Sequence, residues 1–191
     1  MCIRDRDCPA SPAEGDDVTG TEDRTYAENY DDVSIYQLSD ERVAEMISKQ
    51  TECTMTWSNR EGHPLAVIMS YLERDGHLWL SATKSRKRIP ALRRDPRSSI
   101  VISSVGPDMG PKKTITYKGR IVIHDDDPDV KAWFYPAFAE RLHGERGQAK
   151  MDQFVEFLDT PERVILEFIP ESDIRYDGDK MAAATPDPEG S

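Results

Sequence analysis

The feature that most constrains the fold is a series of short strand patterns joined by tight turns. Arg74-Asp75-Gly76 separates two of these strands by a hairpin turn, which makes them antiparallel neighbours. Regular spacing of this kind favours a small antiparallel barrel, and the chain shows neither a βαβ alternation nor a GxGxxG sequence after a strand. Six strands are predicted: Thr51–Trp57, Pro64–Leu72, His77–Ala82, Ser98–Ser104, Thr114–His124 and Glu162–Ile169.

Helical patterns lie before, between and beside these strands. Ser39 is a candidate N-cap, and Val43, Met46 and Ile47 share one face of the helix that follows it. Pro136 is expected to kink or divide an aromatic-rich helix, and Gly119 inside a strand indicates a bulge or a bend of the barrel. The helix that contains Pro136 is predicted at Val130–Leu142, and two more helices are predicted at Ile89–Arg94 and Met151–Leu158.

The chain divides into one folded body and two tails. Its 191 residues suffice for one domain, but only 37% of them are hydrophobic. Residues 1–33 are acidic and almost without large aliphatic side chains, and residues 179–191 are rich in Pro, Ala and Gly without periodicity. Both ends are therefore predicted to be disordered tails, and residues 34–178 to form the domain.

Several classes of protein are disfavoured by composition. The longest uncharged stretch falls short of the roughly 18 residues of a membrane span, and the first residues lack the apolar core of a signal peptide. Three cysteines make no disulfide framework, so a cytoplasmic location is expected. A net charge of −11 argues against general nucleic-acid binding.

One stretch opposes this acidic balance. The basic segment, Lys84–Arg97 (KSRKRIPALRRDPR), contains seven bases and one acid. It follows a strand and enters a short helix, a place where a phosphate can be held by Arg, Lys and hydroxyl groups. We interpret Ser85, Arg86 and Lys87 as a phosphate clamp; the alternative is a solvated basic loop. In the second half, Asp95 can instead pair with a neighbouring arginine, which makes direct ligand contact the lesser alternative there.

No side-chain catalyst is evident in the sequence. The four histidines lack metal-ligand spacing, so no metal site is predicted, and no GxSxG nucleophile motif is present. The aromatic residues of the predicted helix, among them Trp133 and Phe138, suit core or dimer packing, with a substrate-covering role as the alternative. If the protein is an enzyme, a cofactor should carry its chemistry.

Taken together, these elements resemble the pyridoxamine 5′-phosphate oxidase-like superfamily of flavin-binding split barrels, including its flavin- and deazaflavin-dependent oxidoreductases. The resemblance rests on DGHLWLSATKSRKRIPALRRDPRSSIVIS, on the later YKGRIVI strand and on the closing PESDIRYDG. It implies a mainly β fold, a six-stranded antiparallel split β-barrel with flanking helices. It also implies a homodimer that binds FMN, or alternatively coenzyme F420, through its phosphate at the subunit interface.

The resemblance also implies roles for particular residues. Arg86 and Lys87 match the phosphate-binding pair, and Ser85 the hydroxyl before it. Thr114 matches a polar side chain that reaches the cofactor from the partner subunit. Two strand segments match the positions beside the cofactor ring: Val67, Ile68, Met69 and Ser70 on one strand, and Leu80 and Ser81 at the end of the next.

The chain departs from the true oxidases at two positions. Leu65 stands where those enzymes carry an arginine, and Ser70 where they use a lysine for substrate phosphate. Vitamin B6 oxidation is therefore not expected. The sequence predicts an FMN- or F420-dependent oxidoreductase that transfers hydride to or from an unidentified small molecule. The alternative is a non-catalytic flavin- or haem-binding carrier or sensor on the same barrel.

Overall fold

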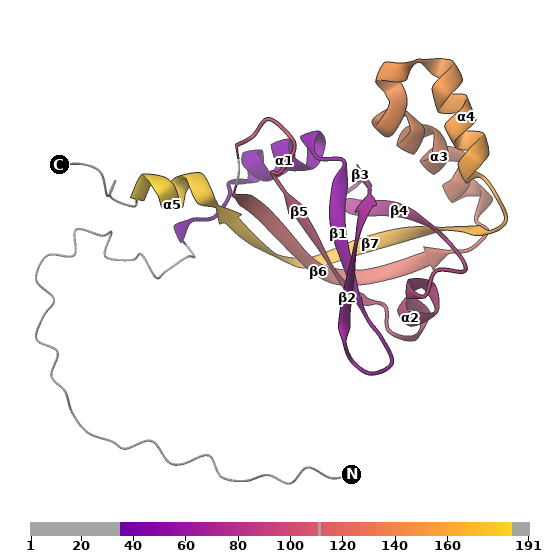
Figure 1. The fold of residues 1–191 in the computed structure, drawn as a ribbon, viewed down its shortest axis with the longest axis horizontal. Helices are drawn as coiled ribbons and strands as arrows, with labels where there is room; N and C mark the ends of the chain where they lie inside the picture. The colour runs from indigo at the N-terminus through magenta and orange to yellow at the C-terminus, as the bar shows by residue number, and fades with distance from the viewer. Residues whose placement is uncertain (1–34, 111, 185–191) are drawn as a thin grey trace, which may run out of the picture.

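The computed structural model describes residues 35–110 and 112–184, which form one seven-stranded antiparallel sheet with helices around it (Figure 1). The predicted N-terminal tail, 1–33, lies outside the described residues. The predicted C-terminal tail, 179–191, begins within helix α5, Gly178–Ala184, and its remainder from residue 185 also lies outside them. The strands are β1 (Glu52–Ser58), β2 (Pro64–Ser70), β3 (Leu72–Arg74), β4 (His77–Thr83), β5 (Arg97–Ser103), β6 (Lys113–His124) and β7 (Arg163–Asp177).

The sheet order shows how the barrel is made. Neighbouring strands follow the order β2-β1-β5-β6-β7-β4-β3, so the two edge strands, β2 and β3, are consecutive in the chain. Only Tyr71 separates them, which means that the sheet must curl until its two edges approach each other. The mainly β barrel fold predicted from the sequence is confirmed.

The predicted number of strands, six, was wrong by one. Pro64–Leu72 was expected to be a single strand, but it changes partner at Tyr71, whose side chain is fully buried. The Tyr71 amide donates to the Thr51 carbonyl at 3.1 Å, and its own carbonyl accepts from Arg141 Nε at 3.1 Å. Periodicity could not show this break, because both halves are apolar and extended.

Gly119 marks the bend that the sequence predicted. The pairing of β6 with β7 shifts register between Lys118 and Gly119, and a Cβ atom at Gly119 would lie 2.2 Å from the Ile169 carbonyl oxygen. Pro170 faces this irregular position, where a missing amide is tolerated. Beyond this position β7 continues to Asp177, well past the predicted end at Ile169.

The helices cover the ends of the barrel and agree broadly with prediction. Ser39 caps α1 by accepting from the Arg42 amide, and Pro136 lies inside one continuous helix, α3, without dividing it. Helices α3 and α4 stand together beyond one end of the sheet (Figure 1) and carry a second, largely aromatic core, as the core interpretation of Phe138 and its neighbours predicted. The helices are α1 (Asp40–Lys49), α2 (Arg88–Arg94), α3 (Pro128–His143), α4 (Gln148–Leu158) and α5, with a short 3₁₀ turn, Gly144–Arg146, between α3 and α4.

Candidate functional site

A cavity of about 310 Å³ opens where β4 leads into α2, and we call it the anion pocket. Strands β2 and β4 supply one side, the basic segment and the start of β7 supply three arginines, and α3 and α4 supply an apolar wall. Its lining residues are Met69, Ser70, Ser81, Ala82, Thr83, Arg86, Arg88, Phe138, Leu142, Phe154, Phe157, Leu158 and Arg163.

Backbone hydrogen bonds position the arginines. After β4 ends, the Arg86 amide donates to the Thr83 carbonyl at 3.1 Å, and the Ile89 amide donates to the Arg86 carbonyl at 2.9 Å. Ile89 is buried in the barrel core and anchors the start of α2. Because Thr83 pairs with Arg163 in the sheet, Arg163 lies beside the same corner although it is far away in the sequence.

These arginines, unlike several other bases on the protein, have no acidic partner among the described residues. In the part of the chain that the structure describes, no ion pair involves Arg86, Arg88 or Arg163. Arg163 donates to the Ser81 hydroxyl at 3.3 Å, whereas Arg88 Nε is buried without a hydrogen-bond partner. A buried, unsatisfied guanidinium nitrogen is costly unless an anion satisfies it.

The pKa values reflect this crowding. Burial lowers the pKa of the Arg88 guanidinium, and the charge of Arg86 lowers it further. Burial also lowers the pKa of Arg163, again with a contribution from Arg86. An anion bound between these three groups would relieve both their repulsion and their loss of hydration. The pocket is thus suited to a phosphoryl or carboxylate group.

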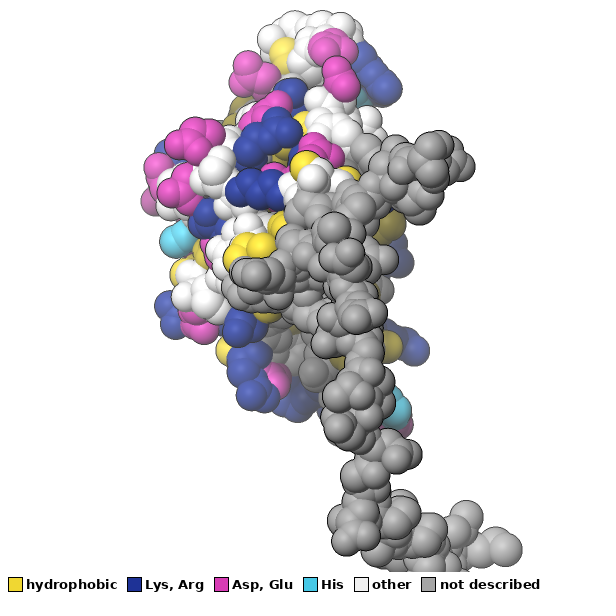
Figure 2. Space-filling model, turned by 90° about the vertical axis from the view of Figure 1, so that its left-hand side faces the viewer, with side chains coloured by type: hydrophobic (Ala, Val, Ile, Leu, Met, Phe, Trp, Pro, Cys, Tyr) yellow, Lys and Arg dark blue, Asp and Glu magenta, His cyan; other side chains and the backbone are white. Residues whose placement is uncertain are grey.

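The second half of the basic segment is arranged differently. Arg93 pairs with Asp125 at 2.5 Å, Arg94 donates to the Ser58 carbonyl at 3.1 Å, and Arg97 pairs with Asp95 at 2.7 Å. These three bases therefore have partners within the protein, as the alternative interpretation of this half proposed. The same holds on the face toward α1 and α5, where basic and acidic side chains are interspersed (Figure 2) and Arg175 pairs with Asp40.

The structure brings some of the predicted site residues together and separates others. Met69, Ser70, Ser81 and Arg86 all line the anion pocket. Leu80 is fully buried in the barrel core, and Ile68 points to solvent with 67% of its surface exposed. The predicted residues that do not line the pocket are Val67, Ile68, Leu80, Ser85, Lys87 and Thr114. Their roles, which the resemblance places partly at a dimer interface, stay predictions.

The predicted site residues did not include Arg88 and Arg163 or the apolar wall. Arg88 stood in the basic segment and could have been included by its charge alone. No signal in the sequence marked Arg163, because its place depends on the pairing of β7 with β4, strands separated by most of the domain.

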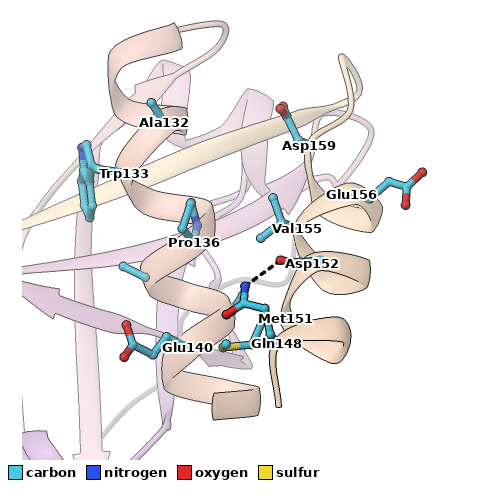
Figure 3. A pocket seen from close by; sticks show the side chains of 12 residues that line it. Ala132, Trp133, Pro136, Glu140, Gln148, Met151, Asp152, Val155, Glu156 and Asp159 are labelled. Atoms are coloured by element: carbon cyan, nitrogen blue, oxygen red, sulfur yellow. Dashed lines mark hydrogen bonds between the residues drawn. The ribbon is translucent and has the colours of Figure 1, made fainter. Parts of the chain in front are cut away.

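A larger cavity lies elsewhere among the described residues and does not suit an anion. It measures about 880 Å³ and lies between α3 and α4, with Trp133, Pro136, Met151 and Val155 among its lining residues (Figure 3). No lysine or arginine lines it, and Gln148 donates to Asp152 along α4 at 2.7 Å. We therefore take the smaller cavity as the functional site, because its lining carries three arginines and that of the larger cavity carries none.

Among the described residues, no group of His, Cys, Asp or Glu side chains is arranged to hold a metal ion. None of the described helices is both long and apolar enough to cross a membrane.

Comparison with known proteins identifies the family. The sequence model described as pyridoxamine 5′-phosphate oxidase matches residues 39–168, which is well over half of the chain. The chain belongs to the pyridoxamine 5′-phosphate oxidase family. The resemblance stated from the sequence is thereby confirmed. A search of the curated proteins found no match.

Solved structures of low identity share the fold. The conserved hypothetical protein Rv2991 from Mycobacterium tuberculosis is 20% identical, with a TM-score of 0.65 over 81% of this chain and 94% of its own. An F420 reductase is 16% identical, with a TM-score of 0.51 over 68% of this chain and 94% of its own. HutZ, the heme storage protein from Vibrio cholerae, is 11% identical, with a TM-score of 0.56 over 72% and 94%. One fold therefore serves both a reductase and a storage protein.

Proposed function

We propose that this protein is a flavin-dependent oxidoreductase that binds FMN through its phosphate and transfers hydride to or from a small molecule. The proposal includes the homodimer and the cytoplasmic location expected from the sequence. It does not include vitamin B6 oxidation, because Leu65 and Ser70 stand in place of two basic residues of the true oxidases.

The observation that carries the proposal is the set of three arginines without acidic partners around the anion pocket. Arg88 Nε is buried and unsatisfied, and the charge of Arg86 contributes to lowering the pKa of both Arg88 and Arg163. Guanidinium groups bind phosphate oxygens with paired, charge-assisted hydrogen bonds. The residues present therefore fit the phosphate of a nucleotide-like cofactor.

The lining of the pocket indicates how this chain would contribute to a reaction. In the described lining there is no His, Cys, Asp, Glu or Tyr that could act as an acid, base or nucleophile. The bound flavin would supply the hydride acceptor and donor. The three arginines would hold the anionic end, Ser70 and Ser81 would offer hydroxyls, and the apolar wall would exclude water.

FMN suits this site better than coenzyme F420, which remains the alternative. A phosphomonoester carries close to two negative charges at neutral pH, whereas the phosphodiester of F420 carries one. Three converging guanidiniums compensate the larger charge more fully. F420 would instead draw on the bases outside the pocket, such as Lys84 and Lys87, for its anionic tail.

The second candidate is a flavin carrier without catalysis. It is favoured by the same absence of an acid or base in the described lining, because holding a cofactor requires nothing more than the arginines and the wall. A haem carrier is less well supported, since no histidine lines the pocket.

Cofactor titration tests the proposal. Purified protein is titrated with FMN and with F420, and binding is followed by the change in cofactor fluorescence. In the Arg86→Ala/Lys87→Ala double variant, loss of the Arg86 contact alone, worth about 1.5–3 kcal/mol, should lower FMN affinity at least tenfold. Unchanged affinity in that variant would refute the phosphate clamp. Multiple turnovers with a reductant and an electron acceptor would then distinguish an enzyme from a carrier.

A further inference from the structure

Helix α4 ends at the anion pocket with an exposed phenylalanine. Phe157 lines the pocket, yet 66% of its surface is open to solvent. Phe154 and Leu158, on the same face of the helix, also line the pocket, and Leu158 is almost completely buried. The apolar wall thus runs from the protein core to the pocket mouth, and Phe157 forms its outer end.

Packing does not explain why a phenylalanine stands at this position. The second core cluster contains Leu158, with Phe154 and Val155 packed against it, but Phe157 is not part of that cluster. A large apolar side chain left in water loses the free energy that burial would give. Phe157 therefore does not serve the packing of α4 on α3.

The ring of Phe157 stands beside one of the pocket's charges. The guanidinium carbon of Arg163 lies 5.5 Å from the centroid of the Phe157 ring, within the range of a cation–π contact. Arg163 also contacts Ser81, so the ring and the phosphate-binding groups belong to one arrangement. A ligand whose anionic end reaches the arginines would leave the pocket alongside this ring.

We propose that Phe157 is a specificity-determining residue of the anion pocket. Its side chain stacks on the planar aromatic ring of a ligand whose phosphate is bound by the arginines. This inference rests on the proposed function and adds to it the residue that recognises the cofactor's ring: FMN should be preferred over sugar phosphates and inorganic phosphate. Aromatic rings stack face to face or edge to face with a gain beyond the area that they bury.

The experiment compares three ligands on matched variants. FMN, ribose 5-phosphate and inorganic phosphate are titrated into the wild type, Phe157→Ala, Phe157→Tyr and Ile174→Ala. Ile174 serves as the control because it is also a large exposed apolar residue, at 59%, and does not line the pocket. Binding is followed by calorimetry, and the oligomeric state of each variant by sedimentation.

The expected result is selective. Phe157→Ala should weaken FMN binding by about tenfold, a typical loss for a deleted stacking contact, and leave the other two ligands within about twofold. Phe157→Tyr should retain FMN affinity, and Ile174→Ala should bind all three ligands as the wild type does.

Three results would overturn the inference. If Phe157→Ala binds FMN as the wild type does, while Arg86→Ala/Lys87→Ala still loses affinity, the stacking role is refuted and the phosphate clamp is not. An equal loss for all ligands, or a changed oligomeric state with parallel losses, would assign Phe157 to folding or to subunit contact. Wild-type protein that binds phosphate but not FMN would refute the proposed function as well.

Discussion

The two halves of the basic segment are both rich in basic residues but have opposite surroundings. In the first half, Arg86 and Arg88 face a cavity and have no acidic partner among the described residues. In the second half, Arg93 and Arg97 each pair with an aspartate. The sequence shows four bases and no acid in the first half, and three bases and one acid in the second, which already favoured the first half as the clamp. The fold completes the distinction by placing Asp125 beside Arg93 and Arg163 beside the pocket.

The difference also has an energetic side. Exposed ion pairs such as Arg93–Asp125 contribute little to stability, whereas like charges gathered at a partly buried site oppose folding. We therefore infer that Arg88 and its neighbours are retained for ligand binding, although they lower the stability of the ligand-free protein. Sites of function commonly reduce stability in this way.

The largest expected effect separates the two halves by ligand affinity. Arg86→Ala/Arg88→Ala should weaken FMN binding by at least about 100-fold, because each arginine contributes charge-assisted hydrogen bonds worth about 1.5–3 kcal/mol. The matched variant Arg93→Ala/Arg94→Ala, from the same helix, should bind within about twofold of the wild type. Fluorescence titration measures both. Equal losses in the two variants would show that the segment acts only as a diffuse positive surface.

A smaller effect of opposite sign is expected on stability. Without ligand, Arg88→Met should unfold at a higher temperature, by roughly 2–4 °C, because it removes a buried nitrogen without a partner and a repulsive charge. Arg94→Met, which loses the hydrogen bond to the Ser58 carbonyl, should show no such gain. Calorimetry in a buffer free of phosphate makes the comparison, and a lower melting temperature for Arg88→Met would contradict it.

The smallest effect concerns the pH dependence of stability in the second half of the basic segment. Hydrogen bonds from the Arg97 side chain and amide lower the pKa of Asp95 to about 2 from an ordinary 3.8. Since the folded pKa is the lower one, this contribution to stability is complete above about pH 4 and is lost as the pH falls toward 2. Between those pH values the melting temperature should fall less in Asp95→Asn than in the wild type. An equal fall in both proteins would mean that the Asp95–Arg97 pair does not contribute to stability.

Much of the fold could be predicted from the sequence, because the relevant signals are local. The hairpin at Asp75-Gly76, the N-cap at Ser39 and the bulge at Gly119 each depend on a few neighbouring residues. The break at Tyr71 and the extension of β7 to Asp177 could not be predicted. They are set by partners far away in the chain, Arg141 and strand β6.

The sequence by itself determined that this chain is a small antiparallel barrel with a cluster of bases after a strand. Periodicity, turn residues and local charge depend only on residues that are close together in the sequence. Only the tertiary structure decided that Arg88 and Arg163 join Arg86 around one cavity. Arg163 and the aromatic wall reach Arg86 and Arg88 from the closing strand and two distant helices. Electrostatic and apolar contacts depend on distance in space, and the curl of the sheet sets that distance.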